Sequence, residues 1–95
     1  MTRAQMIAWL TLEGWLWHPY GNGHLAHVQR PLGPRRDYGL FPCCLVVIGQ
    51  GVSGGITAKY YPNDQTYAGF GGPWDTATDE QVQLIYQEIV KHEQN

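Results

Sequence analysis

Three of the four histidines gather in the short segment 15–29, WLWHPYGNGHLAHVQ, together with two Trp and one Tyr. Imidazole nitrogens bind metal ions and change charge near neutral pH, so this segment is the first place to look for chemistry. A structural zinc site needs four ligands and a catalytic zinc site needs three. Whether His18, His24 and His27 can converge on one ion depends on the element that carries them.

The pair Asn22-Gly23 is typical of a two-residue type I′ turn, so residues 15–29 are predicted to form a β-hairpin. In this register His18 faces His27, whereas His24 lies on the opposite face because side chains alternate along a strand. Two histidines are too few for a metal site, and we expect no metal and no cofactor. A small metal-binding or enzymatic protein that uses His18 and His27 is an open alternative.

The same alternation divides the hairpin into two faces. One face carries Trp15, Trp17, Val28 and Arg30, and its indole rings are typical of a core. The other face carries aliphatic, aromatic and imidazole side chains, namely Leu16, His18, Tyr20, Leu25, His27 and Gln29. We expect the first face to pack against the rest of the domain and the second to form an outward contact surface.

A loop rich in Pro, Gly and Arg follows over residues 30–39, RPLGPRRDYG. Its Arg30, Arg35, Arg36 and Tyr38 have the side-chain types that bind phosphates and stack on bases. The chain has a net charge of −2, however, and a dedicated nucleic-acid domain usually carries a broader basic surface. A nucleic-acid-binding accessory protein that uses this loop is therefore the alternative. A solvated loop, or a rim of Arg contacts to an acidic protein partner, is preferred.

No motif supports catalysis. The stretch 49–54, GQGVSG, matches the G-x-G-x-x-G of dinucleotide-binding loops, but a strand-like segment follows where that motif needs a helix. Ser53 has no base or orienting acid assigned to it by the sequence. Cys43 and Cys44 are adjacent, so a disulfide between them would be strained, and we expect buried free thiols. The chain is predicted not to be an enzyme.

Composition also favours a binding protein. Charged residues make up 15% of the chain, against about 25% in average domains, and there are four Trp, six Tyr and two Phe. We therefore expect an exposed apolar or aromatic patch for a protein partner or a second copy of the chain. Residues 1–61 hold five cations and two acids, whereas residues 62–95 hold one cation and six acids. No segment is long and apolar enough for a membrane span or a signal peptide, so a reducing cytoplasm is expected.

The elements that position these residues follow from capping and periodicity. Thr2-x-x-Gln5 and Thr78-x-x-Gln81 are capping-box patterns that predict a helix over residues 3–13 and another at the end of the chain. Between them, strands are expected in the hairpin and at 41–49, 56–61 and 66–72, with a turn at 62–65. The predicted fold is one α+β domain over residues 1–95: an antiparallel meander of four to five strands, with both helices on one face.

This layout resembles the small phage-encoded inhibitors of bacterial defence, such as anti-CRISPR proteins: one domain, a capped helix at each end, and an aromatic-rich sheet between them. The resemblance implies a non-enzymatic protein that occupies a surface of a host defence complex, such as a CRISPR effector. It assigns no role to any residue. From the residues themselves, we predict a partner-binding surface made of Leu16, His18, Tyr20, Leu25, His27, Arg30, Arg35, Arg36 and Tyr38.

Overall fold

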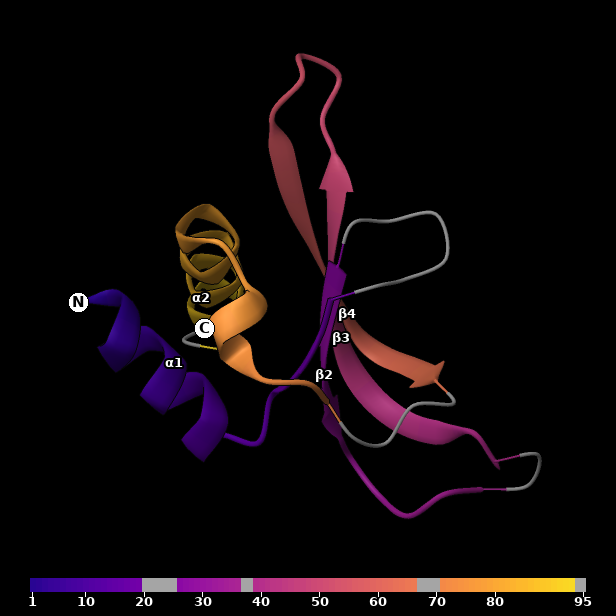
Figure 1. Ribbon diagram of the computed structural model, residues 1–95. Coiled ribbons are helices and arrows are strands. Elements are labelled where there is room, and N and C mark those ends of the chain that lie inside the picture. Colours follow the sequence, from indigo (N-terminus) through magenta and orange to yellow (C-terminus); the bar gives the residue numbers. More distant parts are fainter. Residues whose placement is uncertain (20–25, 37–38, 67–70, 94–95) are drawn as a thin grey trace.

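The computed structural model describes residues 1–19, 26–36, 39–66 and 71–93 of the chain. Figure 1 shows a sheet with helices on one of its sides. In chain order the elements are α1 (Arg3–Leu12), β1 (Leu16–His18), β2 (Ala26–Pro31), β3 (Phe41–Gln50), β4 (Ile56–Thr66), the 3₁₀ turn η2 (Trp74–Thr76) and α2 (Asp79–Glu93).

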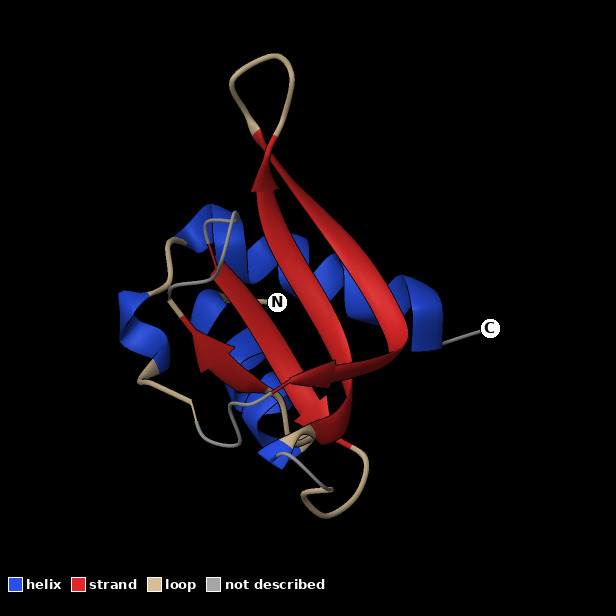
Figure 2. Ribbon diagram, turned by 90° about the vertical axis from the view of Figure 1, so that its right-hand side faces the viewer, coloured by secondary structure: helices blue, strands red, loops and turns tan. Residues whose placement is uncertain are grey.

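The strands form one antiparallel sheet in the order β1-β2-β3-β4. Each strand therefore pairs with the strand that follows it, which is a meander and needs no crossover connection. Helices α1 and α2 pack together against the same face of the sheet (Figures 1 and 2). The predicted α+β fold, with a helix from each end on one face, is confirmed. None of the described helices has the length and apolar character needed to cross a lipid bilayer.

Both helices begin at the predicted capping boxes. The backbone N–H of Gln5 donates to the Thr2 hydroxyl at 3.1 Å, and the N–H of Thr2 donates to the Gln5 side chain at 2.8 Å. Thr78 and Gln81 make the same pair of bonds at 3.1 and 2.9 Å. These bonds satisfy backbone donors that the first helical turn leaves unpaired. Helix α1 then ends before Gly14, whose positive φ of +92° suits a residue without Cβ.

The core lies between the helices and the sheet. Trp15, Trp17 and Val28, which the hairpin pattern assigned to the core, are all essentially buried. They pack with apolar side chains of β3 and of the helices, among them Leu10, Val46, Ile48, Val82, Ile85 and Ile89. Trp17 also stacks on Trp74 at a centroid distance of 5.4 Å, and its Nε1 donates to the Thr76 hydroxyl at 2.7 Å. The segment that leads into α2 is thereby attached to β1.

The predicted turn at 62–65 is wrong, because β4 continues through it to Thr66. In the β3–β4 register Leu45 faces Tyr61 and Cys43 faces Asp64, so two residues of β4 lie opposite Cys44. This is a β-bulge, and a bulge on an edge strand accommodates a Pro at position 62 without losing a required ladder bond. Beyond the bulge β4 bends away from the helices (Figure 1).

The strand expected at 66–72 lies largely outside the described residues, which exclude 67–70. Thr66 belongs to β4, and Gly72 forms an isolated antiparallel bridge with Trp17. Leu84, which the helical pattern placed on the exposed side of the last helix, is half-buried and packs against the core instead. Among the described residues the sheet has four strands.

Candidate interaction surface on the outer face of the sheet

The face of the sheet opposite α1 and α2, which we call the outer face, is the candidate functional surface. Figure 2 looks onto it, and both helices lie behind the sheet. The strand registers place two rows of side chains across it. One row is His18, His27, Val47 and Lys59, and the next is Leu16, Gln29, Leu45 and Tyr61. Residues from all four strands therefore meet on this surface.

The hairpin register predicted from Asn22-Gly23 is confirmed in the described strands, where His18 pairs with His27 and Leu16 pairs with Gln29. Leu16, His18 and His27 are half-buried on the outer face. Two further residues predicted for this surface, Tyr20 and Leu25, lie outside the described residues, as does the turn itself.

The two imidazoles of His18 and His27 stack with a centroid distance of 4.7 Å and an interplanar angle of 12°. The Nε2 atom of His18 is buried and has no hydrogen-bond partner among the described residues. Burial lowers the pKa of His18 because it disfavours the charged imidazolium. Within the described ranges, no three His, Cys, Asp or Glu side chains lie close enough together to hold a metal ion. The stacked pair therefore supplies a flat contact at one end of the surface.

The middle of the outer face is aliphatic. Leu45 and Val47 of β3 lie between the hairpin residues and β4, and both keep part of their surface exposed. The prediction that residues 41–49 are buried on both faces holds best on the helix side, where Cys44, Val46 and Ile48 are buried and Pro42 is half-buried. On the outer side Cys43 is buried while its neighbours are half-exposed. Alternation along the predicted strand was the signal that would have added Leu45 and Val47 to the surface.

Two cation–aromatic pairs flank this aliphatic middle. The Lys59 ammonium lies 5.3 Å from the centre of the Tyr61 ring, and the Arg35 guanidinium lies 4.7 Å from the centre of the Phe41 ring. Such contacts hold a long cationic side chain against a ring and leave its charge accessible. Lys59 and Tyr61 are further residues that the sequence pattern did not assign to the surface. Their odd positions in the predicted strand 56–61 would have revealed them.

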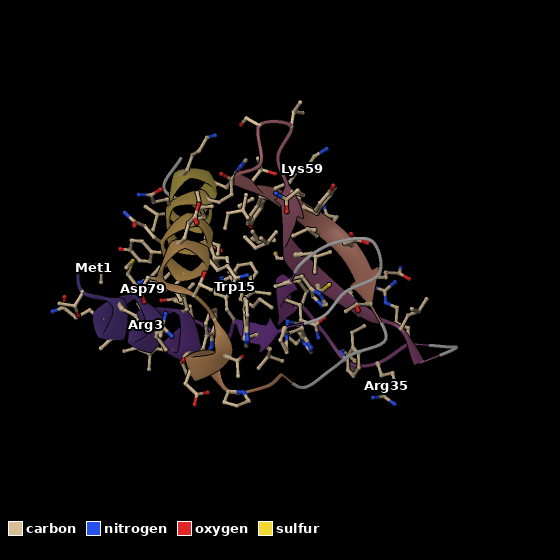
Figure 3. The ribbon with its side chains drawn as sticks, turned by 45° about the horizontal axis from the view of Figure 1, so that its top comes forward. Met1, Arg3, Trp15, Arg35, Lys59 and Asp79 are labelled. Carbon is tan, nitrogen blue, oxygen red and sulfur yellow. The ribbon has the colours of Figure 1, made fainter. Side chains whose placement is uncertain are left out.

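The structure does not bring Arg30 to this surface. Arg30 lies on the helix side, where its guanidinium is 2.6 Å from the Glu93 carboxylate and 5.0 Å from the centre of the Trp15 ring. Its partner comes from the far end of α2, so no local pattern in residues 30–39 indicates this pairing. Figure 3 shows Trp15 in the middle of the molecule and Arg35 at its periphery.

Arg36 lies at the far end of the sheet. Its backbone N–H donates to the Leu40 carbonyl at 2.7 Å, and its side chain lines a small pocket with Pro42, Asp64 and Gln65. The remaining residue predicted from this loop, Tyr38, lies outside the described residues. Of the four candidate residues in the loop, the structure therefore places Arg35 beside the outer face and Arg36 at its end.

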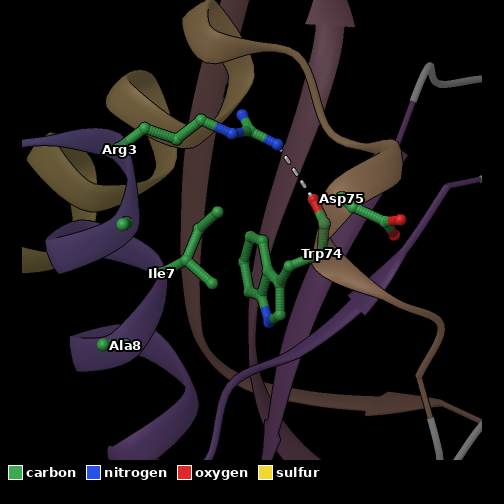
Figure 4. Close-up of a pocket in the computed structure, with 6 residues that line it drawn as sticks. Arg3, Ile7, Ala8, Trp74 and Asp75 are labelled. Atoms are coloured by element: carbon green, nitrogen blue, oxygen red, sulfur yellow. Dashed lines mark hydrogen bonds between the residues drawn. The ribbon is translucent and has the colours of Figure 1, made fainter.

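A second concave region is a groove of about 400 Å³ between α1 and η2 (Figure 4). Ile7, Ala8 and Trp74 give it mostly apolar walls. Arg3 crosses its end, donating to the Trp74 carbonyl at 3.3 Å and pairing with Asp79 at 3.1 Å. Because that guanidinium already has partners, the groove does not offer it to a ligand, and the outer face is the better candidate.

The two cysteine thiols, Cys43 and Cys44, do not form a reactive site. Burial, reinforced by the Asp64 carboxylate and by Cys44, raises the pKa of Cys43 to about 11. A thiol with such a pKa is protonated at neutral pH and is a poor nucleophile. Cys44 lies on the helix side and contacts the carbonyl oxygen of Pro62 at 3.5 Å. Both cysteines are free in the structure.

No protein-family model, curated protein or solved structure matches this chain.

Proposed function

We propose that this protein is a non-enzymatic binding module that contacts another protein through the outer face of its sheet. The observation that carries the proposal is the composition of that face, which neither helix covers. Its aliphatic middle, formed by Leu45 and Val47, is bordered by Leu16 and the imidazoles of the hairpin on one side and by a Tyr ring and cations on the other. An apolar centre inside a polar rim is the usual anatomy of a protein–protein contact.

The outer face favours a protein over a nucleic acid as partner. Sheets that bind single strands use aromatic rings as stacking platforms for successive bases. Here the exposed middle of the face consists of Leu45 and Val47 of β3, which have no ring, and Gln29 beside them is fully buried. The loop considered for phosphate binding also has Arg30 paired with Glu93. Nucleic-acid binding therefore remains the alternative.

The resemblance to phage-encoded inhibitors of bacterial defence indicates which partner the outer face would contact. By that resemblance the outer face occupies a surface of a host defence complex, and the protein works in the reducing cytoplasm, where free thiols such as Cys43 and Cys44 persist. The proposal for the contact surface does not depend on this setting, because it rests on the side chains of the sheet.

Affinity capture from a host lysate, followed by direct binding to the captured protein, tests the proposal. Tyr61→Ala and Arg35→Ala truncate the two rim positions, and Leu12→Ala is the control because Leu12 is 86% exposed on α1. We expect each rim variant to weaken binding at least about tenfold, or about 1.4 kcal/mol, as truncated aromatic and Arg contacts do. Circular dichroism confirms that each variant folds. Unchanged binding by both folded rim variants would refute the proposed surface.

A further inference from the structure

We infer that the partner of the outer face is a protein surface that presents carboxylates at both ends of the contact. This inference rests on the proposed function and adds the chemistry of the partner to it. The observation behind it is that the fold separates the charges of the chain between the two sides of the sheet.

In the part of the chain that the structure describes, acidic side chains belong almost entirely to the helical side. Among the described residues, six of the seven acids lie in or beside the helices: Glu13, Asp75, Asp79, Glu80, Glu88 and Glu93. The remaining one, Asp64, lies in β4 and accepts a hydrogen bond from the N–H of Gln65 at 2.7 Å. Among the described residues, cations therefore outnumber acids on the sheet side, although the whole chain has a net charge of −2.

The cations of the sheet side are available for a partner. Arg35, Arg36 and Lys59 form no ion pair among the described residues, whereas Arg3 and Arg30 on the helical side are both paired. The rings of Tyr61 and Phe41 hold Lys59 and Arg35 against the surface. A partner carboxylate can therefore meet these charges without first breaking an ion pair within the described part of the protein.

The two cationic regions lie at opposite ends of the aliphatic middle. Lys59 faces Val47, and Arg35 lies over Phe41, which is six residues earlier on the same strand. At about 3.3 Å per residue, the backbone positions of Phe41 and Val47 on β3 are about 20 Å apart. This exceeds the screening length of about 8 Å at physiological salt, so each end attracts its own carboxylate independently. Complementary charges at the rim of a contact mainly raise the association rate and select the partner.

Fluorescence anisotropy with a defined probe tests the inference. The probe is a fluorescein-labelled oligo-L-glutamate of about ten residues, which reaches about 33 Å when extended and so spans both ends. We expect binding at low ionic strength that weakens steeply with added salt. Lys59→Glu and Arg35→Glu should each weaken it at least about threefold, as one exposed ion pair contributes, and their effects should multiply in the double variant.

Lys91→Glu is the matched control, since it makes the same charge change on α2, and it should leave probe binding within about twofold of the wild type. Lys59→Gln removes the charge without reversing it and should give a smaller loss than Lys59→Glu. Oligo-L-lysine and oligothymidylate of the same length are the comparison probes. The inference is overturned if oligo-glutamate does not bind, if Lys91→Glu is as damaging as Lys59→Glu, or if oligo-lysine or oligothymidylate binds more tightly.

This outcome is separable from the test of the proposed function. If Tyr61→Ala abolishes capture of a protein but oligo-glutamate does not bind, the contact surface is correct and the carboxylate chemistry is wrong. If oligo-glutamate binds through Lys59 and Arg35 but no captured protein depends on Tyr61, the outer face attracts anions and the proposed function is wrong.

Discussion

His18 shows how one side chain can serve both the surface and the stability of the fold. Its ring lies on the outer face against His27, yet its Nε2 atom is buried and finds no hydrogen-bond partner in the described part of the chain. A buried imidazole is tolerated more easily as the neutral form, because a charged ring would lose its hydration. The residue that first suggested metal chemistry therefore contributes a flat, uncharged contact.

The lowered pKa of His18 predicts a pH-dependent stability. Because burial opposes protonation of the folded form, the unfolded chain binds the proton first as the pH falls below the ordinary value of 6.5. The contribution of His18 to the free energy of unfolding should therefore be fully present above pH 6.5 and should decrease as the pH falls toward the lowered pKa. Urea unfolding at a series of pH values should show this slope in the wild type.

The slope should largely disappear in His18→Gln, which cannot take up the proton. His92→Gln makes the same substitution in α2 and controls for the general effect of losing an imidazole. Equal pH slopes in the wild type and His18→Gln would show that His18 is not responsible.

At the scale of elements, strand β4 and the segment before η2 show where local sequence patterns mislead. Pro62-Asn63-Asp64 has the composition of a turn, but pairing with β3 continues through it because the bulge opposite Cys44 absorbs the extra residue.

Gly71, in the segment before η2, lies against β1, where a Cβ would be 2.6 Å from the carbonyl oxygen of Trp17 and 2.8 Å from its nitrogen. The close approach itself requires glycine at this position.

Gly71→Ala should therefore destabilise the fold by about 1–3 kcal/mol, as overpacking against fixed backbone does. Gly55→Ala is the matched control, since a Cβ there meets no atom within 4 Å and its φ is not positive. That variant should remain within about 0.5 kcal/mol of the wild type. Chemical denaturation measures both, and equal stabilities of the two variants would contradict the close contact at Gly71.

At the scale of the whole molecule, one core joins both helices to the sheet, so the outer face depends on residues that lie far from it. Leu10 of α1 is fully buried in that core, whereas Leu12 on the same helix is 86% exposed. Leu10→Ala should reduce the free energy of unfolding by about 2–5 kcal/mol, since it leaves a cavity. Leu12→Ala should change it by less than about 0.5 kcal/mol.

Near- and far-ultraviolet circular dichroism should report the same unfolding transition in Leu10→Ala, because helices and sheet share this core. Two separate transitions would show that α1 unfolds independently of the sheet.

The sequence by itself determined the features that depend on neighbouring residues. The Asn22-Gly23 pair predicted the register that brings His18 to His27, and Thr2 and Thr78 marked the beginnings of the helices, because turns and caps are built from a few consecutive residues. Alternation also separated the buried Trp15 and Trp17 from the outward side chains of the hairpin.

Only the tertiary structure decided how distant segments combine. It turned Arg30 toward Glu93 and extended β4 past Pro62. It also placed Lys59 in the row of His18 and His27, and Tyr61 in the row of Leu16. Each of these outcomes depends on a partner tens of residues away or on pairing with another strand, and no local periodicity encodes that partner. The outer face is therefore a product of the assembled sheet, because its rows are completed only when all four strands are paired.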